Sequence, residues 1–279
     1  MIEINRIDLG RPSILQFRGP DAVRFLNGQL TQDVRRVSGG KISLSSCVTD
    51  AKGRLQFRVN LLEHDDGGLW ISGLPEWAEN LETRLTRYLI ADDVEVSDLT
   101  GKFSLHHFTD SPGAAAPGVI VRESNRYGIP GVDWWVPCDL QVEYPGDVLE
   151  GDALEAMRIS NKTPAWGSEL IEGILPPEAL LDGTDISYHK GCYIGQEIIS
   201  RIKSAGKVNK LLTRFTFDST IPVALGLLKN SEGKEAGEIT SISPIAKDEK
   251  REALGFVKRG NAEVFYHTPD GTAHPLMMS

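Results

Sequence analysis

The sequence has little cysteine, and the three cysteines are scattered. Cys47, Cys138 and Cys192 lie far apart and form no Cys-x-x-Cys pair. Disulfide-stapled domains and structural zinc sites both need closely spaced cysteines, so this spacing argues against both. Isolated thiols fit a reducing compartment, and we therefore expect a cytoplasmic protein.

Long apolar runs and recognisable nucleotide motifs are also missing. No stretch approaches the roughly 20 apolar residues that a membrane-spanning helix needs. The start, Met1-Ile2-Glu3-Ile4, lacks the basic-then-apolar pattern of a signal peptide. The Walker, dinucleotide-binding and zinc-protease motifs do not occur either.

The chain has fewer basic than acidic residues, 30 Lys and Arg against 39 Asp and Glu. The net charge is −9 and the isoelectric point is about 5.2. Such a balance disfavours a broad surface for nucleic acid or an anionic membrane. We therefore expect no direct nucleic-acid binding and no membrane association, although a local basic patch remains compatible with this balance.

The pattern along the 279 residues predicts an α+β protein of two or three modest domains. Strand–helix–strand–strand order in the first hundred residues suits ferredoxin-like units. From about Leu211, short strands separated by Gly and Pro predict a small closed β-domain. We place the boundary between residues 1–205 and 206–279. The expected strands are 13–18, 42–49, 54–62, 69–72, 94–96, 103–108, 211–217, 235–243, 253–258 and 262–266, and the expected helices cover 20–30, 75–89, 153–159 and the residues after 196.

The most informative stretch is His189–Glu197, in which Gly191 and Gly195 bracket Cys192. Apolar spacing directly after it predicts a helix, so the cysteine would lie just ahead of a helix N-terminus and beside Lys190. Both influences favour the thiolate, as in reactive cysteines. The alternative is a small buried hydrophobe that packs the loop.

A basic run follows without an intervening acidic residue: Arg201, Lys203, Lys207, Lys210 and Arg214. Such a run could hold a carboxylate tail or a phosphate. The alternative is the solvated end of a helix and its loop. Next to the cysteine stretch, an anion site is the better interpretation.

Other polar and aromatic residues give weaker signals. His64, His106 and His107 have no metal-site spacing, and we expect surface or strand positions for them. Trp134, Trp135 and Trp166 could wall an aromatic ligand, with core packing as the default. Glu169 and Glu178 flank Pro176-Pro177; a buried carboxylate there could hydrogen-bond a pterin-like ring, although helix capping also explains Glu178.

Lys190–Glu197 closely resembles the signature of the YgfZ family, Lys-Gly-Cys-Tyr-x-Gly-Gln-Glu. Further segments that resemble this family occur in the same order over nearly the whole chain. They are Gly19–Ala22, Phe25–Gln29, Thr31–Asp33, Asp50–Arg54, Arg158, Pro164, Trp166-Gly167, Glu169-Leu170 and Gly237–Pro244.

This resemblance implies the fold of the glycine cleavage T-protein. Two interleaved ferredoxin-like α+β domains and a C-terminal β-barrel would surround a central folate pocket. It also implies tetrahydrofolate, or a one-carbon derivative, as cofactor. The implied role is in making or maintaining iron–sulfur enzymes, including tRNA-modifying ones, through transient contact with iron–sulfur client or assembly proteins.

The resemblance also implies which residues form the site. Cys192 would be the essential thiol, acting as transient ligand, redox group or nucleophile; it cannot hold a cluster alone, since clusters take about four ligands. Lys190 would help to keep it ionised, and Arg201 or its basic neighbours would meet the folate glutamate tail. The other expected binding residues are Gly191, Tyr193, Gly195, Gln196, Glu197, Arg158, Trp166 and Glu169.

Two departures from the family patterns bear on the reaction. T-proteins place a catalytic aspartate after the strand that resembles Leu69–Ser72, whereas Gly73–Leu85 contains only Glu76, Glu79 and Glu82. A longer side chain would shift the geometry of proton transfer. The usual glutamate and glycine after the arginine at 158 are replaced by Ser160 and Lys162, which weakens the case for folate contacts at those two positions.

Three functions are therefore compared. The first is a folate-dependent accessory protein for iron–sulfur enzymes. The second is an aminomethyltransferase or related one-carbon transferase, which the missing aspartate disfavours. The third is a folate-binding scaffold in which Cys192 only packs. Shared fold does not decide among them, because activity resides in the site.

Overall fold

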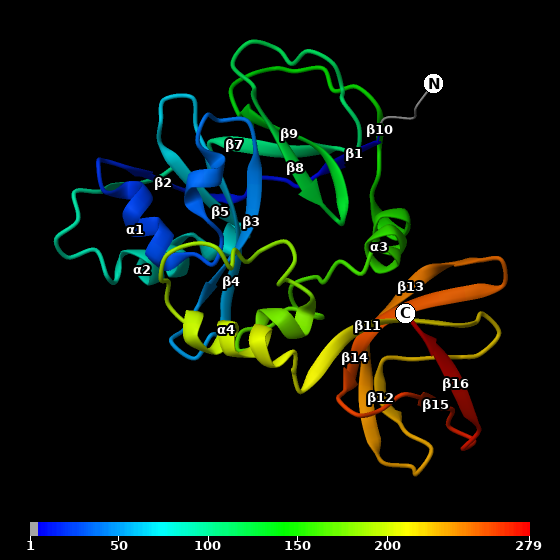
Figure 1. The fold of residues 1–279 in the computed structure, drawn as a ribbon. Coiled ribbons are helices and arrows are strands. Elements are labelled where there is room, and N and C mark those ends of the chain that lie inside the picture. Colours follow the sequence, from blue (N-terminus) through cyan, green and yellow to red (C-terminus); the bar gives the residue numbers. More distant parts are fainter. Residues whose placement is uncertain (1–4) are drawn as a thin grey trace. The chain divides into compact units, whose positions relative to one another are not determined.

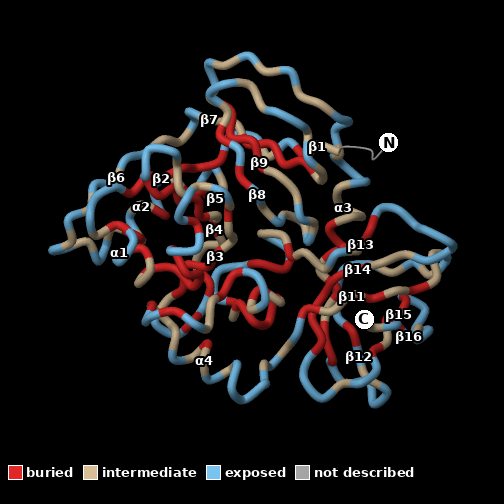
Figure 2. Tube along the Cα trace, turned by 45° about the horizontal axis from the view of Figure 1, so that its top comes forward, coloured by how far each residue is buried: buried red, intermediate tan, exposed pale blue. Residues whose placement is uncertain are grey.

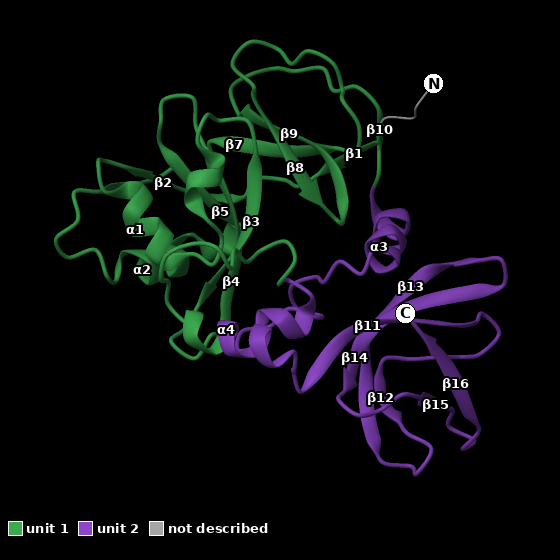
Figure 3. Cartoon of the chain, in the orientation of Figure 1, with its two compact units in different colours: residues 1–149, 182–198 green, residues 150–181, 199–279 purple. Residues whose placement is uncertain are grey.

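A computed structural model of the chain describes residues 5–279, and these residues form two compact units (Figure 3). Unit 1 contains residues 5–149 and Asp182–Ile198; unit 2 contains Glu150–Leu181 and Ile199–Ser279. The chain therefore leaves unit 1, enters unit 2, and returns once with a short segment. The division predicted at residue 206 stays a prediction, because compactness does not show which part folds alone.

The first sheet of unit 1 contains five strands in the order β10-β1-β7-β9-β8 (Figure 1). Strand β7 is central, and the neighbouring β9 and the edge strand β8 continue the sheet with antiparallel pairing. Only the short edge pair of β1 and β10 is parallel. The strand bounds are β1 Asn5–Asp8, β7 Phe103–Phe108, β8 Ile120–Arg126, β9 Ile129–Pro137 and β10 Asp147–Val148.

The second sheet of unit 1 has the order β3-β4-β5-β2-β6, with every neighbour antiparallel. The chain interleaves the sheets, because β1 precedes this whole sheet in sequence and its partner β7 follows it. The bounds are β2 Ser13–Arg18, β3 Ser43–Thr49, β4 Leu55–Glu63, β5 Leu69–Gly73 and β6 Glu95–Asp98, with helices α1 Ala22–Gln29, η1 Val34–Val37, η2 Pro75–Trp77 and α2 Ala78–Thr86.

The helices of this unit are amphipathic, as their spacing predicts. In α1, Ala22, Phe25, Leu26 and Gln29 are buried at positions i, i+3, i+4 and i+7. The buried face of α2 is formed by Leu81 and Leu85. Tyr88, expected on the same face, is exposed because α2 ends at Thr86. Figure 2 shows buried residues concentrated along the strands of both sheets.

A closed barrel of six strands, in the order β11-β14-β13-β12-β15-β16, forms most of unit 2. Gly237 on β13 and Gly255 on β14 lie where the strands approach closely, because an added Cβ at either would meet backbone of the neighbouring strand. The bounds are α3 Gly151–Ser160, η3 Pro176–Ala179, α4 Gln196–Ala205, β11 Lys210–Asp218, β12 Gly226–Lys229, β13 Glu235–Lys247, β14 Lys250–Lys258, β15 Val264–His267 and β16 Ala273–Met278.

The observed elements confirm the α+β class and the small closed C-terminal β-domain. The sequence pattern missed β1, β8, β9, β10, β12 and β16. No helix among the described residues is long and apolar enough to cross a membrane.

Candidate functional site

The signature loop, which we define as Lys190–Gly195, belongs to unit 1 and is held at its C-terminal end by hydrogen bonds to the backbone of Ile194. The Ile194 N–H donates to the carbonyl of Gly28, just before the end of α1, at 3.1 Å. The Thr49 hydroxyl, at the end of β3, donates to the carbonyl of Ile194 at 2.6 Å. The loop is therefore attached both to α1 and to the β3–β4 hairpin.

Lys190 holds the other end of the signature loop. Its ammonium group donates to the carbonyl oxygens of Asn27, Leu30 and Gln32 at 2.7, 2.6 and 2.8 Å. The last carbonyls of a helix lack partners within it, so this cation caps the C-terminus of α1. Burial lowers the pKa of Lys190 to about 7, against the opposing charge of Asp33. The structure thus gives Lys190 an anchoring role, and its expected help in keeping the Cys192 thiol ionised stays a prediction.

Gly195 packs against the hairpin turn and must be glycine there. Its φ is +87°, and an added Cβ would lie 2.5 Å from the carbonyl oxygen of Asp50 and 2.8 Å from the Cα of Gly53. A side chain at this position would clash with backbone that cannot move away easily. The close approach fixes where the loop runs into α4.

Cys192 lies on the exposed part of this pinned loop. Lys190 and Tyr193, on either side of the exposed Gly191–Cys192 pair, are only 9% and 7% exposed, whereas Cys192 is a free, exposed thiol. Helix α4 begins at Gln196, four residues later, so the thiol precedes the helix by about one turn. A cysteine in this position does not pack the core, and its sulfur is accessible to a reaction partner.

Two segments that are far apart in the sequence contact the signature loop: the first helix with its exit, and the hairpin turn. These two segments, like the loop itself, are among those that resemble the YgfZ family. Arg84 of α2 adds a contact that sequence reasoning missed: its guanidinium donates to Gln56, Gln29 and the carbonyl of Thr49 at 2.5, 3.0 and 2.7 Å. In the sequence, the only sign of this role was that Arg84 is a cation next to Leu85, a position expected to be buried.

The segment ahead of the signature is anchored by a buried ion pair that the sequence did not reveal. Asp185 is fully buried and accepts two bonds from Arg58 of β4, at 2.7 and 3.2 Å. The adjacent Cys47 is also buried, and burial raises the pKa of its thiol well above the ordinary value, with the charge of Asp185 adding to the shift. Cys47 is therefore held as a neutral thiol.

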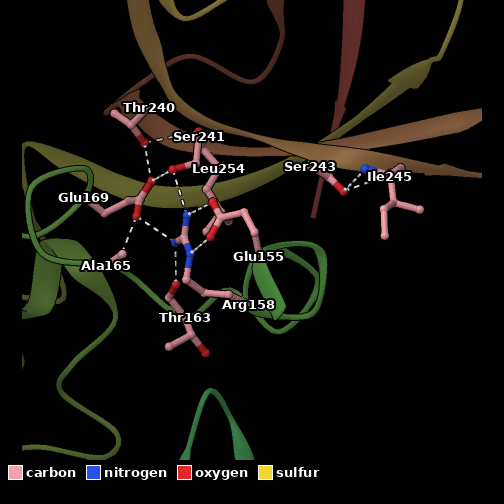
Figure 4. Close-up of polar contacts among 10 residues, drawn as sticks. All are labelled: Glu155, Arg158, Thr163, Ala165, Glu169, Thr240, Ser241, Ser243, Ile245 and Leu254. Atoms are coloured by element: carbon pink, nitrogen blue, oxygen red, sulfur yellow. Dashed lines mark hydrogen bonds and ion pairs between the residues drawn. The ribbon is translucent and has the colours of Figure 1, made fainter. Parts of the chain in front are cut away.

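The other predicted polar residues form a separate cluster inside unit 2 (Figure 4). Arg158 of α3 uses all five of its N–H groups. It donates to Glu155 at 2.8 and 2.6 Å, to Glu169 at 2.9 Å, to the Ser241 hydroxyl at 2.8 Å, and to the carbonyl of Thr163 at 2.8 Å. The guanidinium therefore links α3 to the barrel strand β13.

Glu169 is the acceptor at the centre of this cluster and is completely buried. Besides Arg158, its carboxylate accepts from the Ala165 N–H at 3.0 Å and from the hydroxyls of Thr240 and Ser241 at 2.7 and 2.6 Å. A buried charge is tolerated when it is paired and hydrogen-bonded in this way. The Arg158–Glu169 cluster thus holds Glu150–Leu181 onto the barrel.

The structure thus places the predicted site residues in two groups, one in each unit. Lys190–Gly195 lies in unit 1, and Arg158 and Glu169 lie in unit 2. Trp166 is half-buried next to the second group. Arg201 is exposed on α4, and at its start Gln196 is half-buried and Glu197 exposed.

The basic run and the histidines also have definite surroundings. Of the five cations, Lys210 pairs with Glu238 and Arg214 with Glu252, each at 3.3 Å, so the run is not one free patch. His106 and His107 lie on β7, as expected of strand residues, and both are buried. Within residues 5–279, no group of three or more His, Cys, Asp or Glu is arranged to hold a metal ion.

Comparison with known proteins places this architecture among relatives. No family model matches the chain. It is 25% identical over 236 residues to the tRNA-modifying protein YgfZ of Cronobacter sakazakii, covering 74% of this chain and 69% of that protein. It is 24% identical over 312 residues to the mitochondrial iron–sulfur cluster assembly factor IBA57 homolog of Dictyostelium discoideum, covering 96% and 73%.

A third relative and a solved structure extend the comparison. An aminomethyltransferase of Desulfitobacterium hafniense is 24% identical over 304 residues, covering 92% of this chain and 79% of that protein. The glycine cleavage system aminomethyltransferase T from Bartonella henselae superposes with a TM-score of 0.75 at 16% identity, over 98% and 84% of the two chains. The chain is a distant relative of the YgfZ/IBA57 and aminomethyltransferase proteins.

This relationship confirms the resemblance that the signature predicted, and the superposition confirms the T-protein fold. The names of the YgfZ/IBA57 and aminomethyltransferase relatives give three activities: tRNA modification, iron–sulfur cluster assembly and aminomethyl transfer. At 24–25% identity the comparisons do not choose among them. The residues of the site have to do so.

The structure shows the surroundings of the residues that depart from the YgfZ and T-protein patterns. Glu76 and Glu79 are exposed on η2 and α2, and Glu82 is half-buried. None of the three is shielded from water as a tuned general base usually is. The Ser160 hydroxyl donates to Glu252, and Lys162 has a left-handed backbone, φ +53°, which suits the glycine usual in the YgfZ family.

Proposed function

We propose that this chain is a tetrahydrofolate-binding accessory protein for the assembly or maintenance of iron–sulfur enzymes, including tRNA-modifying ones, and that Cys192 is its working thiol. The observation that carries this proposal is the free, exposed thiol on a loop anchored at both ends. A loop anchored at both ends with an accessible sulfur suits a group that must meet another protein or an iron centre. The YgfZ and IBA57 relatives support the same role.

The proposal includes the finer architecture that the resemblance implies. The two interleaved five-stranded sheets would be ferredoxin-like domains, and with the barrel they would surround a central folate pocket. Tyr193 supports a polar ligand near the signature, because its hydroxyl is buried and forms no hydrogen bond with another described residue. Arg201, exposed on α4, is the cation proposed for the folate glutamate tail.

Arg158 and Glu169 fit direct contact with folate less well. Their polar atoms are already used by one another and by groups of unit 2. A folate contact would have to replace one of these bonds and leave a buried group without a partner, which costs about 1–3 kcal/mol. We therefore propose that this pair acts by holding unit 2 in shape.

A folate-dependent aminomethyltransferase is the second candidate, and the T-protein fold favours it. The solvent-facing glutamates at 76 and 79, in the segment where T-proteins have an aspartate, oppose it. Incubation with tetrahydrofolate and an aminomethylated lipoyl carrier tests this reaction. Formation of methylenetetrahydrofolate over repeated turnovers would make the transferase the leading function.

The decisive experiment measures a [4Fe–4S] enzyme in cells that lack their own YgfZ-type protein. Wild type, Cys192→Ala and Cys138→Ala are expressed to equal levels. Cys138 is the matched control, since it is also a free, exposed cysteine but lies after β9, away from the signature. We expect rescue by wild type and Cys138→Ala, and little rescue by Cys192→Ala.

Two other outcomes would change the proposal. Rescue by Cys192→Ala would keep the iron–sulfur role and remove the thiol from its mechanism. Failure of the soluble wild-type chain to rescue would reject the iron–sulfur role. Calorimetric titration with tetrahydrofolate tests the cofactor separately, and absence of binding at millimolar concentration would reject it.

A further inference from the structure

A pocket of about 530 Å³ lies wholly within unit 2. Its walls are the first residues of β11, the last residues of β14 and β16, and the turns that follow α3, η3 and α4. Small-molecule sites typically have volumes of about 300–1,000 Å³, so the pocket has the size of a ligand site.

The residues that line this pocket include several cations, in a chain whose net charge is −9. The lining contains five basic side chains and no Asp or Glu: Lys162, Lys207, Lys210, Lys258 and Arg259. Two of them have acidic partners outside the lining, since Lys210 pairs with Glu238 at 3.3 Å and Lys258 with Glu235 at 2.7 Å.

The remaining three cations are not compensated. The side chains of Lys162, Lys207 and Arg259 form no hydrogen bond or ion pair with another residue of the described range 5–279. Like charges brought together around one cavity repel one another unless an anion lies between them. The three free cations therefore select a negatively charged occupant.

The rest of the lining is largely apolar. Leu212 and Val257 are buried beneath the pocket, and Leu180, Leu211 and Met278 also contribute to it. An inorganic anion would leave this surface without a partner. An organic anion would cover it and gain roughly 25 cal/mol for each Å² of apolar surface removed from water.

One of the three free cations, Lys162, has a backbone conformation that is unfavourable for a residue with a side chain. Its backbone is left-handed, φ +53°, a conformation that costs a non-glycine residue of order 1 kcal/mol or more. The lysine adds a third free charge to the pocket.

We propose that this pocket binds a small organic anion, with an aromatic or aliphatic body on the apolar floor and a phosphate or carboxylate group against Lys162, Lys207 and Arg259. This site goes beyond the proposed function and does not depend on it. The volume of about 530 Å³ favours a small molecule over a protein segment, which would need a longer groove.

The test uses the full chain and the fluorescent probe 1-anilinonaphthalene-8-sulfonate, an apolar body with one anionic group. Binding is measured by calorimetry and fluorescence for wild type, for Lys207→Gln/Arg259→Gln, and for the matched control Lys234→Gln/Lys247→Gln, whose lysines are exposed in the same unit outside the pocket. We expect one site whose dissociation constant rises about tenfold in the pocket variant and not in the control. Cys192→Ala should bind like wild type.

Three results would overturn the proposal. One is equal binding by the pocket and control variants. Another is equal affinity for the uncharged parent compound N-phenyl-1-naphthylamine, which would show that only apolar surface is recognised. The third is displacement of the probe by tetrahydrofolate at its own binding concentration, which would make the pocket part of the folate site. Inorganic pyrophosphate should compete only weakly, because it cannot use the apolar floor.

Discussion

Three cysteines that look alike in the sequence have different surroundings in the folded chain. Cys192 and Cys138 are exposed, and Cys47 is buried against the Arg58–Asp185 ion pair. The thiolate is the reactive form of cysteine. Exposure therefore divides the three residues into two accessible thiols and one, Cys47, that is shielded and whose pKa burial raises.

This difference predicts the result of a thiol titration. In the native protein, Ellman's reagent should modify two thiols quickly, and the third only after unfolding in urea. Burial raises the pKa of Cys47 and removes it from solvent, so both effects slow its reaction. Cys192→Ala should leave one fast thiol. Three fast thiols in the native chain would contradict the burial of Cys47.

At the scale of elements, the signature loop is held by contacts with α1 and the β3–β4 hairpin, and glycine has two different roles within it. Gly195 lies against the backbone of Asp50 and Gly53, whereas an added Cβ at Gly191 would meet nothing within 4 Å. The two glycines thus provide a variant and its control inside one loop.

Gly195→Ala should destabilise the chain by about 2 kcal/mol or more, because the new Cβ meets the hairpin backbone and the residue keeps φ +87°. Gly191→Ala should change the free energy of unfolding by less than about 0.5 kcal/mol. Urea denaturation measures both. Equal effects of the two substitutions would show that the loop is not packed against the hairpin.

Another element-scale feature is a buried polar network across three neighbouring strands of the first sheet. Asp133 of β9 accepts from His107 of β7 at 2.9 Å, and from Ser124 and Arg126 of β8 at 2.7 and 2.8 Å. Burial alone would raise the pKa of Asp133, but the charge of Arg126 and the His107 hydrogen bond lower it to about 2. The ionised carboxylate thus joins the strands.

The lowered pKa of Asp133 predicts how stability changes with acid. An unfolded aspartate has a pKa near 3.8, so the unfolded chain binds the proton first as pH falls. The stabilisation is complete above about pH 4 and is lost between pH 4 and 2, in total about 2 kcal/mol. Asp133→Asn should remove this part of the acid dependence and destabilise the chain at pH 7 by about 3 kcal/mol. The exposed Asp139→Asn is the control, and unchanged acid unfolding of Asp133→Asn would contradict the assignment.

Buried charged residues decide which strands the sequence could predict. Strand β2 was found with its observed bounds, because its residues alternate around Ile14, Leu15 and Phe17 and its exposed end is marked by Gly19-Pro20. Strands β8 and β9 were missed because they carry Arg122 and Asp133, charged residues that are buried in ion pairs. Buried pairs look like surface positions when only hydrophobicity is considered.

The site shows a similar limit. The signature identified Lys190–Glu197, but the partners of Lys190 are backbone carbonyls of residues 27–32. Backbone carbonyls occur at every residue and leave no trace in the side-chain pattern. The anchoring role of Lys190 could therefore be found only after the chain was folded.

At the scale of the whole molecule, the chain passes between two compact units three times, and each unit has its own buried ion pair. Arg58–Asp185 belongs to unit 1, and Arg158–Glu169 belongs to unit 2. Loss of one pair should first affect the unit that contains it, because the other unit keeps its own core.

Glu169→Gln tests this division. The substitution leaves the buried Arg158 with its charge only partly balanced by Glu155, which should cost about 3 kcal/mol. Hydrogen exchange should then accelerate in α3 and β13 of unit 2, with little change in the strands of unit 1. Glu172→Gln, at an exposed position three residues further on, should change neither. Equal loss of protection in both units would show that they unfold as one cooperative body, and the signature loop would then depend on the Arg158–Glu169 cluster for its stability.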